Sequence, residues 1–117
     1  MICHVTVETE NLKESVDFYA WLLDLPVARR MEIPSGEIAF LGEEETKLEL
    51  IYSRGYKRSG TAEGITVGFA VRSLKDKMDM LDEKNIPHSP VISPNPHVMF
   101  FYLTDPNGIR IQLLEEK

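Results

Sequence analysis

The 117-residue sequence lacks the features of a disulfide scaffold or a membrane protein. Its one cysteine, Cys3, has no partner for an internal disulfide, which suits a reducing compartment. No uninterrupted apolar run reaches membrane-spanning length, and the first residues carry no basic and apolar signal region. We therefore expect a cytoplasmic protein without a membrane partner.

Positive charge is also scarce. Lys and Arg total 13 against 19 Asp and Glu, which gives a formal net charge of -6. Such a charge repels phosphate backbones, so nucleic acid is not an expected partner. A phosphate-cradling glycine loop, paired zinc cysteines and a nucleophile elbow are all absent from the sequence. The chain does have 43% hydrophobic residues, enough to bury one core.

An internal repeat is the most informative feature of the chain. Residues 11–14 (NLKE) recur, 62 residues further on, as residues 73–76 (SLKD). In each copy an Asn or Ser stands three residues before an acid, the pattern of a capped helix start. Pro26 and Pro87 mark the ends of the two helices. Apolar residues at helical spacing predict core faces of Leu12, Val16, Tyr19 and Leu23 in the first helix and Leu74, Met78 and Leu81 in the second.

Segments with strand character flank each helix, one before it and three after it, separated by short turns. Alternation of apolar with other residues is clearest in the fourth, fifth and eighth of these segments. The order predicts an α+β fold built from two βαβββ repeats. The predicted strands are residues 2–7, 27–33, 37–41 and 47–52, then 65–71, 91–92, 97–103 and 109–114.

We expect a single domain over residues 1–117, with repeat one in 1–53, a linker in 54–63 and repeat two in 64–117. The linker has no apolar period and is expected to be exposed and mobile. It is either a simple joint or a segment whose cations, Arg54, Lys57 and Arg58, contact an anionic ligand.

Residues 105–108 (DPNG) are predicted to form a hairpin turn rather than a catalytic site. Proline presets the turn, Asn and Gly accept positive φ, and Asp can bond the backbone two residues on.

Four features of the chain point to a known family. These are the repeated unit, His4 in the first strand, the Leu-Glu-Leu of residues 48–50 and the C-terminal sequence DPNGIRIQLLEEK. In these features the chain resembles bacterial glyoxalase I. Its relatives form the vicinal-oxygen-chelate superfamily, with bleomycin resistance proteins and extradiol dioxygenases. The resemblance spans essentially the whole chain. It implies that the repeats form half-barrels that face each other around a small-molecule site, within one chain or across a dimer. A homodimer is the expected assembly.

In metal-dependent members of this family, the first and last strands of each repeat each supply one metal ligand. The resemblance places these ligands at His4, Glu49, Thr66 and Gln112. His4 and Glu49 suit a divalent ion such as nickel, zinc, iron or manganese. Gln112 offers an uncharged amide oxygen, which cannot act as a base, and Thr66 is a feeble ligand. We therefore assign His4, Glu49 and, more weakly, Gln112 as metal candidates, and we leave the catalytic residue unassigned.

Each candidate also has an ordinary structural interpretation, a surface histidine for His4 and a solvent-facing strand position for Glu49. Gly68 and Ala70 are small, which fits a cavity beside Thr66 or the close approach of another backbone. The predicted ligand-binding residues are Thr66, Gly68, Ala70 and His97.

Two further histidines could replace the missing metal ligand. His97 opens a predicted strand, and its direction depends on the strand register. His88 follows Pro87 and is expected to be exposed.

These residue assignments are compatible with three classes of function. The first is a glyoxalase-family small-molecule-binding protein with a partly degraded metal site, compatible with lyase, isomerase or dioxygenase chemistry; whether it is an enzyme stays open. The second is a metal-free protein, similar to bleomycin resistance proteins, that sequesters a cationic or aromatic compound; the acidic charge favours it. The third is a non-catalytic partner or regulatory domain. Fold alone cannot choose among them.

Overall fold

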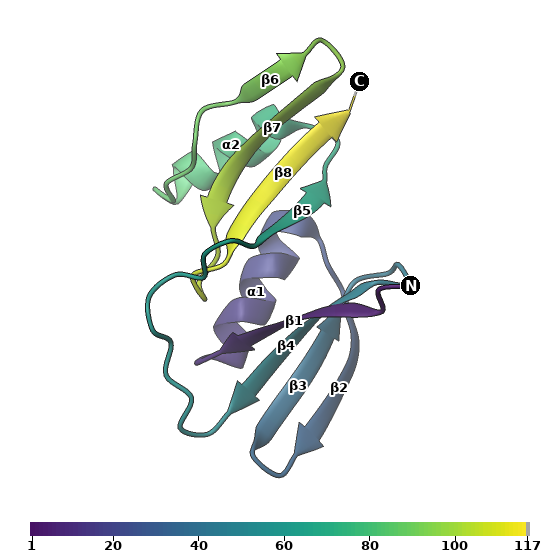
Figure 1. Ribbon diagram of the computed structural model, residues 1–117, viewed down its shortest axis with the longest axis vertical. Coiled ribbons are helices and arrows are strands. Elements are labelled where there is room, and N and C mark those ends of the chain that lie inside the picture. Colours follow the sequence, from purple (N-terminus) through teal and green to yellow (C-terminus); the bar gives the residue numbers. More distant parts are fainter. Residues whose placement is uncertain (117) are drawn as a thin grey trace. The chain divides into compact units, whose positions relative to one another are not determined.

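The computed structural model describes residues 1–116, which divide into a first unit, Met1–Gly60, and a second unit that begins at Thr61. The division falls inside the segment predicted to be the linker. Each unit reads strand, helix and three strands in chain order (Figure 1). The predicted α+β class and its two βαβββ repeats are therefore confirmed.

The first unit forms one four-stranded sheet in the order β1-β4-β3-β2. Strands β1 and β4 run parallel, whereas the other neighbours are antiparallel. The helix α1 packs against β3 and β4 and covers one face of this sheet. The elements are β1 (His4–Thr9), α1 (Leu12–Leu23), β2 (Val27–Ile33), β3 (Gly36–Leu41) and β4 (Lys47–Ser53).

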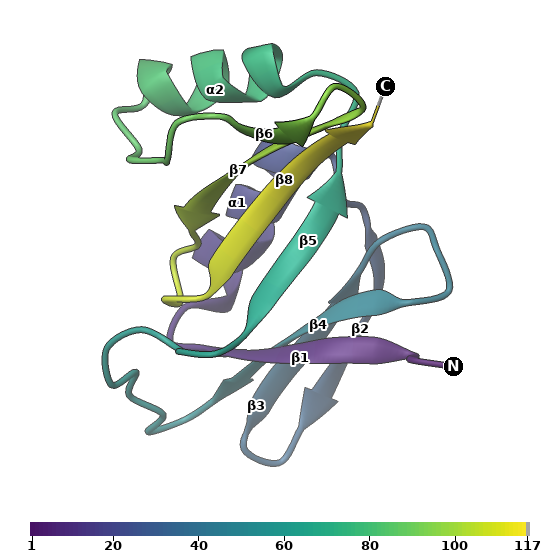
Figure 2. The ribbon, with the colours of Figure 1, turned by 45° about the horizontal axis from the view of Figure 1, so that its top comes forward.

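The second unit repeats this arrangement in the order β5-β8-β7-β6. Strands β5 and β8 are its parallel pair. Figure 2 shows α2 lying along one face of this sheet, where it contacts β7 and β8. The elements are β5 (Thr66–Ala70), α2 (Leu74–Glu83), β6 (Ile92–Asn95), β7 (Val98–Thr104) and β8 (Arg110–Glu116).

Both helices begin at the predicted caps. The side chain of Asn11 accepts a hydrogen bond from the Glu14 backbone N–H at 3.0 Å, and that of Ser73 accepts one from Asp76 at 3.2 Å. Both helices end a few residues before the prolines that were predicted to end them. Asp24 caps α1 in the left-handed conformation with φ 54°, so the helix closes before Pro26 is reached.

The cores lie between each sheet and its helix, as the predicted faces required. Tyr19 and Phe101 are the largest fully buried side chains of the described residues. The prediction of Leu23 as a core residue is wrong, because Leu22 points inward with 0% exposure while Leu23 is half-buried. Within residues 1–116, both helices are too short and too polar to cross a membrane.

The strand β6 also differs from its prediction. It runs through Pro94 to Asn95, and Asn95 pairs with Val98, so the turn before β7 consists of residues 96–97. Residues 94–96 were predicted to separate the strands. Because β6 is an edge strand, Pro94 can occupy it without breaking a central ladder.

The turn at residues 105–108 confirms its structural interpretation. Asp105 is 4% exposed, and its carboxylate accepts hydrogen bonds from the backbone N–H of Asn107 and of Ile109, both at 2.8 Å. Gly108 adopts φ 84°, which an L side chain rarely tolerates. The carboxylate therefore holds the β7–β8 connection in place.

The substitution Asp105→Ala is expected to lower the free energy of unfolding by about 1–3 kcal/mol, because it leaves two part-buried N–H groups without their acceptor. Urea unfolding measures the change. Asp79→Ala is the matched control, since Asp79 is exposed and paired only with Lys75 on the helix surface. A cost for Asp105→Ala no larger than that of the control would contradict this account of the turn.

Candidate functional site

Each sheet has one face under its helix and one face that its own unit leaves open. In β1, His4 and Thr6 lie on the open face, whereas Val7 is buried. In β4, Glu49 stands on the open face between the buried Leu48 and Leu50. The open face of the first sheet therefore carries both of the stronger metal candidates.

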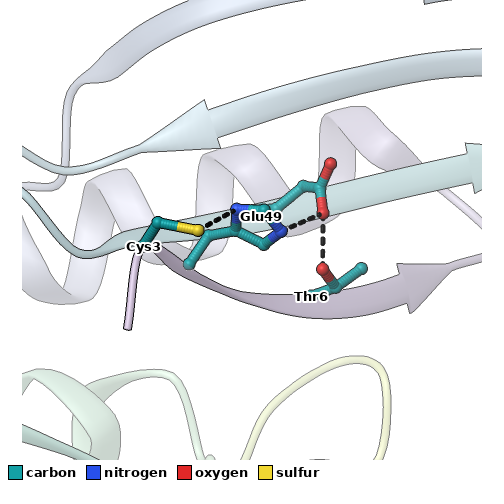
Figure 3. Close-up of polar contacts among 4 residues, drawn as sticks. Cys3, Thr6 and Glu49 are labelled. Carbon is teal, nitrogen blue, oxygen red and sulfur yellow. Dashed lines mark hydrogen bonds and ion pairs between the residues drawn. The ribbon is translucent and has the colours of Figure 1, made fainter. Parts of the chain in front are cut away.

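His4 and Glu49 meet on this face. The distance from His4 Nε2 to Glu49 Oε1 is 3.4 Å, with the two side chains 39% and 12% exposed. The hydroxyl of Thr6 donates a hydrogen bond to the same carboxylate oxygen (Figure 3). On the other side of the imidazole, Cys3 Sγ lies 3.4 Å from Nδ1. The ring edge of His4 also contacts Phe40, with centroids 5.8 Å apart.

The imidazole of His4 and the carboxylate of Glu49 can lie this close only if a proton or a cation stands between them. An imidazole lone pair and a carboxylate oxygen repel each other at this distance unless a positive charge stands between them. Two donors that bind one ion at about 2.0–2.1 Å in tetrahedral coordination lie roughly 3.3 Å apart. The spacing of His4 Nε2 and Glu49 Oε1 therefore fits two positions of a single divalent ion.

The cysteine does not extend this pair into a larger ligand set. Cys3 and Glu49 contact opposite nitrogens of the imidazole, so the sulfur and the carboxylate face away from each other. In the part of the chain that the structure describes, no group of three His, Cys, Asp or Glu side chains could hold a metal ion.

The second unit repeats this geometry with different chemistry. Thr66 of β5 pairs with Arg110, two residues before Gln112 on β8. His4 of β1 pairs with Lys47, two residues before Glu49 on β4. Thr66 and Gln112 therefore hold in the second sheet the places of His4 and Glu49 in the first. Both are neutral, so this pair lacks the donor strength of its counterpart.

Gly68 lies directly beneath the side chain of Gln112. A Cβ built on Gly68 would stand 3.1 Å from Gln112 Oε1, so the amide lies over the glycine. A larger residue at position 68 would therefore make the Gln112 amide move by a few tenths of an ångström. Ala70 lies at the end of the same strand and is exposed.

His97 lies in the turn between β6 and β7 and is exposed. Its backbone N–H donates to the Asn95 side chain at 2.8 Å. The structure thus brings together Thr66, Gly68 and Gln112 in the second unit and leaves His97 at a separate edge of that sheet.

His88 was predicted to be exposed, and this prediction is wrong. Its side chain is only 14% exposed and packs against Phe101, with ring centroids 5.1 Å apart. Nδ1 lies 2.8 Å from the Ser89 carbonyl and Nε2 lies 2.8 Å from Asp82 Oδ1. These two acceptors, the Ser89 carbonyl first, raise the pKa of His88 above its ordinary value of 6.5, while burial opposes them. The doubly protonated ring satisfies both contacts.

The three cations of the linker, Arg54, Lys57 and Arg58, differ from one another in their contacts. Arg54 donates through Nη2 to the Pro34 carbonyl at 2.6 Å, which fastens it to the β2–β3 turn. The backbone N–H of Arg58 donates to Glu10 Oε1 at 2.6 Å, and Lys57 is exposed. A contact of these cations with an anionic ligand stays a prediction.

Two hollows, one in each unit, adjoin the open faces. The first has a volume of about 330 Å³ and lies beside His4, between Phe40, Lys47 and Arg29. The second has a volume of about 510 Å³ and is lined in part by Tyr102 and Arg110. None of these cationic and aromatic residues was predicted from the sequence to line a site. The only signal for Arg110 was its place on the same side of the strand as Gln112.

Comparison with known proteins identifies relatives. A profile of the Glyoxalase/Bleomycin resistance protein/Dioxygenase superfamily matches residues 2–113. The lactoylglutathione lyase of Escherichia coli O157:H7 is 26% identical over 126 residues, which cover 99% of this chain and 93% of the relative. A probable lactoylglutathione lyase of Synechocystis is 23% identical over 123 residues, which cover 97% of this chain and 94% of the relative.

Solved structures share the fold. The trypanothione-dependent glyoxalase I of Leishmania major has a TM-score of 0.85 at 24% identity, covering 99% of this chain and 86% of that one. An antibiotic binding protein from Streptomyces has a TM-score of 0.78 at 14% identity, covering 100% of this chain and 96% of that one. The same fold thus occurs in an enzyme and in a binding protein.

The His88–Asp82 contact is expected to make stability depend on pH. Because the folded-state pKa of His88 is raised, its contribution is fully present below the unfolded value near 6.5 and is lost as pH rises through the folded value. Asp82 is 67% exposed, so its share amounts to about 0.2–1 kcal/mol. NMR titration of the imidazole and urea unfolding at pH 5.5 and 8.5 measure both effects.

Asp82→Asn is expected to lower the pKa of His88 and to flatten the pH dependence, whereas Asp79→Asn, on the same helix, is the control. Titration of His88 at or below its ordinary pKa in the unmodified protein would show the interpretation to be wrong.

Proposed function

Because the chain belongs to the glyoxalase, bleomycin resistance protein and dioxygenase superfamily, we propose that it binds a small organic molecule beside a divalent ion held by His4 and Glu49. The observation that carries the proposal is the 3.4 Å separation of His4 Nε2 and Glu49 Oε1 on an open sheet face next to a hollow of about 330 Å³. The hollow gives a ligand room beside the pair.

The neighbouring side chains prepare the pair for an ion. Thr6 donates to the Glu49 oxygen that faces His4 and so fixes the carboxylate. A proton on His4 Nδ1, directed at the Cys3 sulfur, leaves the Nε2 lone pair on the side of Glu49. One imidazole and one carboxylate suit nickel, zinc, iron or manganese.

A bound divalent ion would act as a Lewis acid that polarises ligand oxygens. The protein's own contribution is to orient the ligand within the hollow. Arg29 lies over the Phe40 ring, with Cζ 4.8 Å from the centroid, and Lys47 lines the same space. The residues that line this hollow include two cations and no carboxylate, so it favours an anionic ligand over a cationic one.

The metal-free alternative, a protein that sequesters a compound without an ion, has one observation in its favour. No third His, Cys, Asp or Glu joins His4 and Glu49 within residues 1–116. A two-ligand site binds more weakly than the four-ligand site of the family's metal-dependent members. Metal binding therefore decides between the two functions.

His4→Ala and Glu49→Gln are each expected to weaken zinc and nickel binding by at least tenfold, because each removes one of the two protein donors. Calorimetric titration of the metal-free protein measures the affinity. Glu37→Gln is the matched control, since Glu37 is an exposed carboxylate of the same sheet that pairs with Arg30. Undetectable binding to the unmodified protein, or loss of binding in His97→Ala instead, would overturn the metal assignment.

The double substitution Thr66→His and Gln112→Glu is expected to add a second zinc or nickel ion per chain, measured by the same calorimetric titration. It gives the second sheet the same donor pair at the same register as the first. The double variant is also expected to exceed the unmodified chain in turnover of the hemithioacetal of methylglyoxal and glutathione, because Gln112 has no titratable proton to move.

Gln112→Glu alone serves as the control for added charge. Rapid turnover by the unmodified chain would show that Gln112 does not limit this chemistry.

A further inference from the structure

The hollow of about 510 Å³ in the second unit lies at the end of its sheet where β7 finishes and β8 begins. Its walls come from Thr104 and Arg110 on those strands and from residues 86–89, which follow α2. Thr61 and Ala62 form the remaining wall, and a hydrogen bond of 3.0 Å joins the Ala62 N–H to the Gly108 carbonyl. All of these residues belong to one unit, so the hollow is complete within it.

Arg110 is the charged group of this hollow. Its Cζ lies 3.8 Å from the centroid of the Tyr102 ring, so the guanidinium lies over the aromatic face in a cation–π contact. Among residues 1–116, no carboxylate lies within ion-pair distance of Arg110. The stacked guanidinium therefore keeps its hydrogen-bond donors free for a ligand.

The rest of the lining matches an anion with an apolar body. Thr61 and Thr104 are among the described residues that line the hollow, and no Asp or Glu is. Ile86, Pro87 and Leu103 supply apolar surface. The imidazole of His88 also lines the hollow, and its Nε2 lies 2.8 Å from the Asp82 carboxylate, which balances the charge of the ring when it is protonated. In a chain with net charge -6, this is a local site of positive charge.

We propose that Arg110, stacked on Tyr102, binds the carboxylate of a small organic acid whose apolar part packs against Ile86, Pro87 and Leu103. A guanidinium matches a carboxylate with two parallel hydrogen bonds, and the contact with the Tyr102 ring restricts the positions that the guanidinium can take. This carboxylate site lies in the second unit and is separate from the ligand site proposed beside His4 and Glu49. It does not depend on the metal pair of the first unit.

Benzoate, titrated into ¹⁵N-labelled metal-free protein with a chelator present, is the probe. The expected shifts occur at backbone amides around the hollow, such as Ala62, Tyr102 and Gly108. Arg110→Gln is expected to weaken benzoate binding about tenfold or more, and Arg110→Lys to weaken it less. Arg72→Gln is the matched control, because Arg72 is an exposed arginine of the same unit outside the hollow.

The spectra of the variants also report whether the fold is retained. Benzyl alcohol, which has a similar body without the charge, is expected to bind at least tenfold more weakly than benzoate. Equal binding of benzyl alcohol, unchanged benzoate binding in Arg110→Gln, or inorganic phosphate binding as tightly as benzoate would each overturn the assignment. Because no metal is present, these outcomes are distinct from failure of the His4–Glu49 site.

Discussion

The parallel pairing of the first and last strands in each unit is the constraint on which the rest of the structure depends. A parallel pair needs a crossover, and in each unit the connection includes a helix and two further strands. The helix then covers one face of the sheet and leaves the other open. A slip of one residue in β1 would turn His4 to the buried face and remove the metal pair.

The same pairing accounts for the likeness and the difference between the two units. The register places His4 near Glu49 in one sheet and Thr66 near Gln112 in the other. The backbone thus offers two equivalent places for donors, and side-chain chemistry decides what each can bind. The charged pair is suited to an ion, whereas the neutral pair is not.

The side chains that line the two hollows are more positively charged than the chain as a whole. The net charge is -6, yet neither hollow has a carboxylate among its lining residues. Each hollow is lined by an arginine that lies over an aromatic ring. These pairs are Arg29 over Phe40 in the first hollow and Arg110 over Tyr102 in the second. The metal-free alternative, with its acidic net charge, was expected to take a cationic or aromatic compound, whereas the charges that line these two hollows support the anionic ligands proposed above.

Much of the fold could be predicted from local patterns. The caps at Asn11 and Ser73 and the turn at Asp105 depend on residues close in sequence, and the structure confirms them. The contacts that sequence analysis missed join distant segments. His88 is covered by Phe101, and Arg110 rests on Tyr102 across two strands.

Such contacts follow from strand register and side-chain packing, which one sequence does not determine. Recognition of the repeat brought the candidate residues of each unit together. It could not tell whether those residues still bind an ion.

The most direct test of the account is the ¹⁵N chemical shift of the three histidine rings during titration of the unmodified protein with zinc. We predict that the Nε2 resonance of His4 shifts progressively with added zinc and levels off as the site fills, while His88 and His97 keep their shifts. An unchanged His4 ring, or a zinc-dependent shift confined to His88 or His97, would contradict the account.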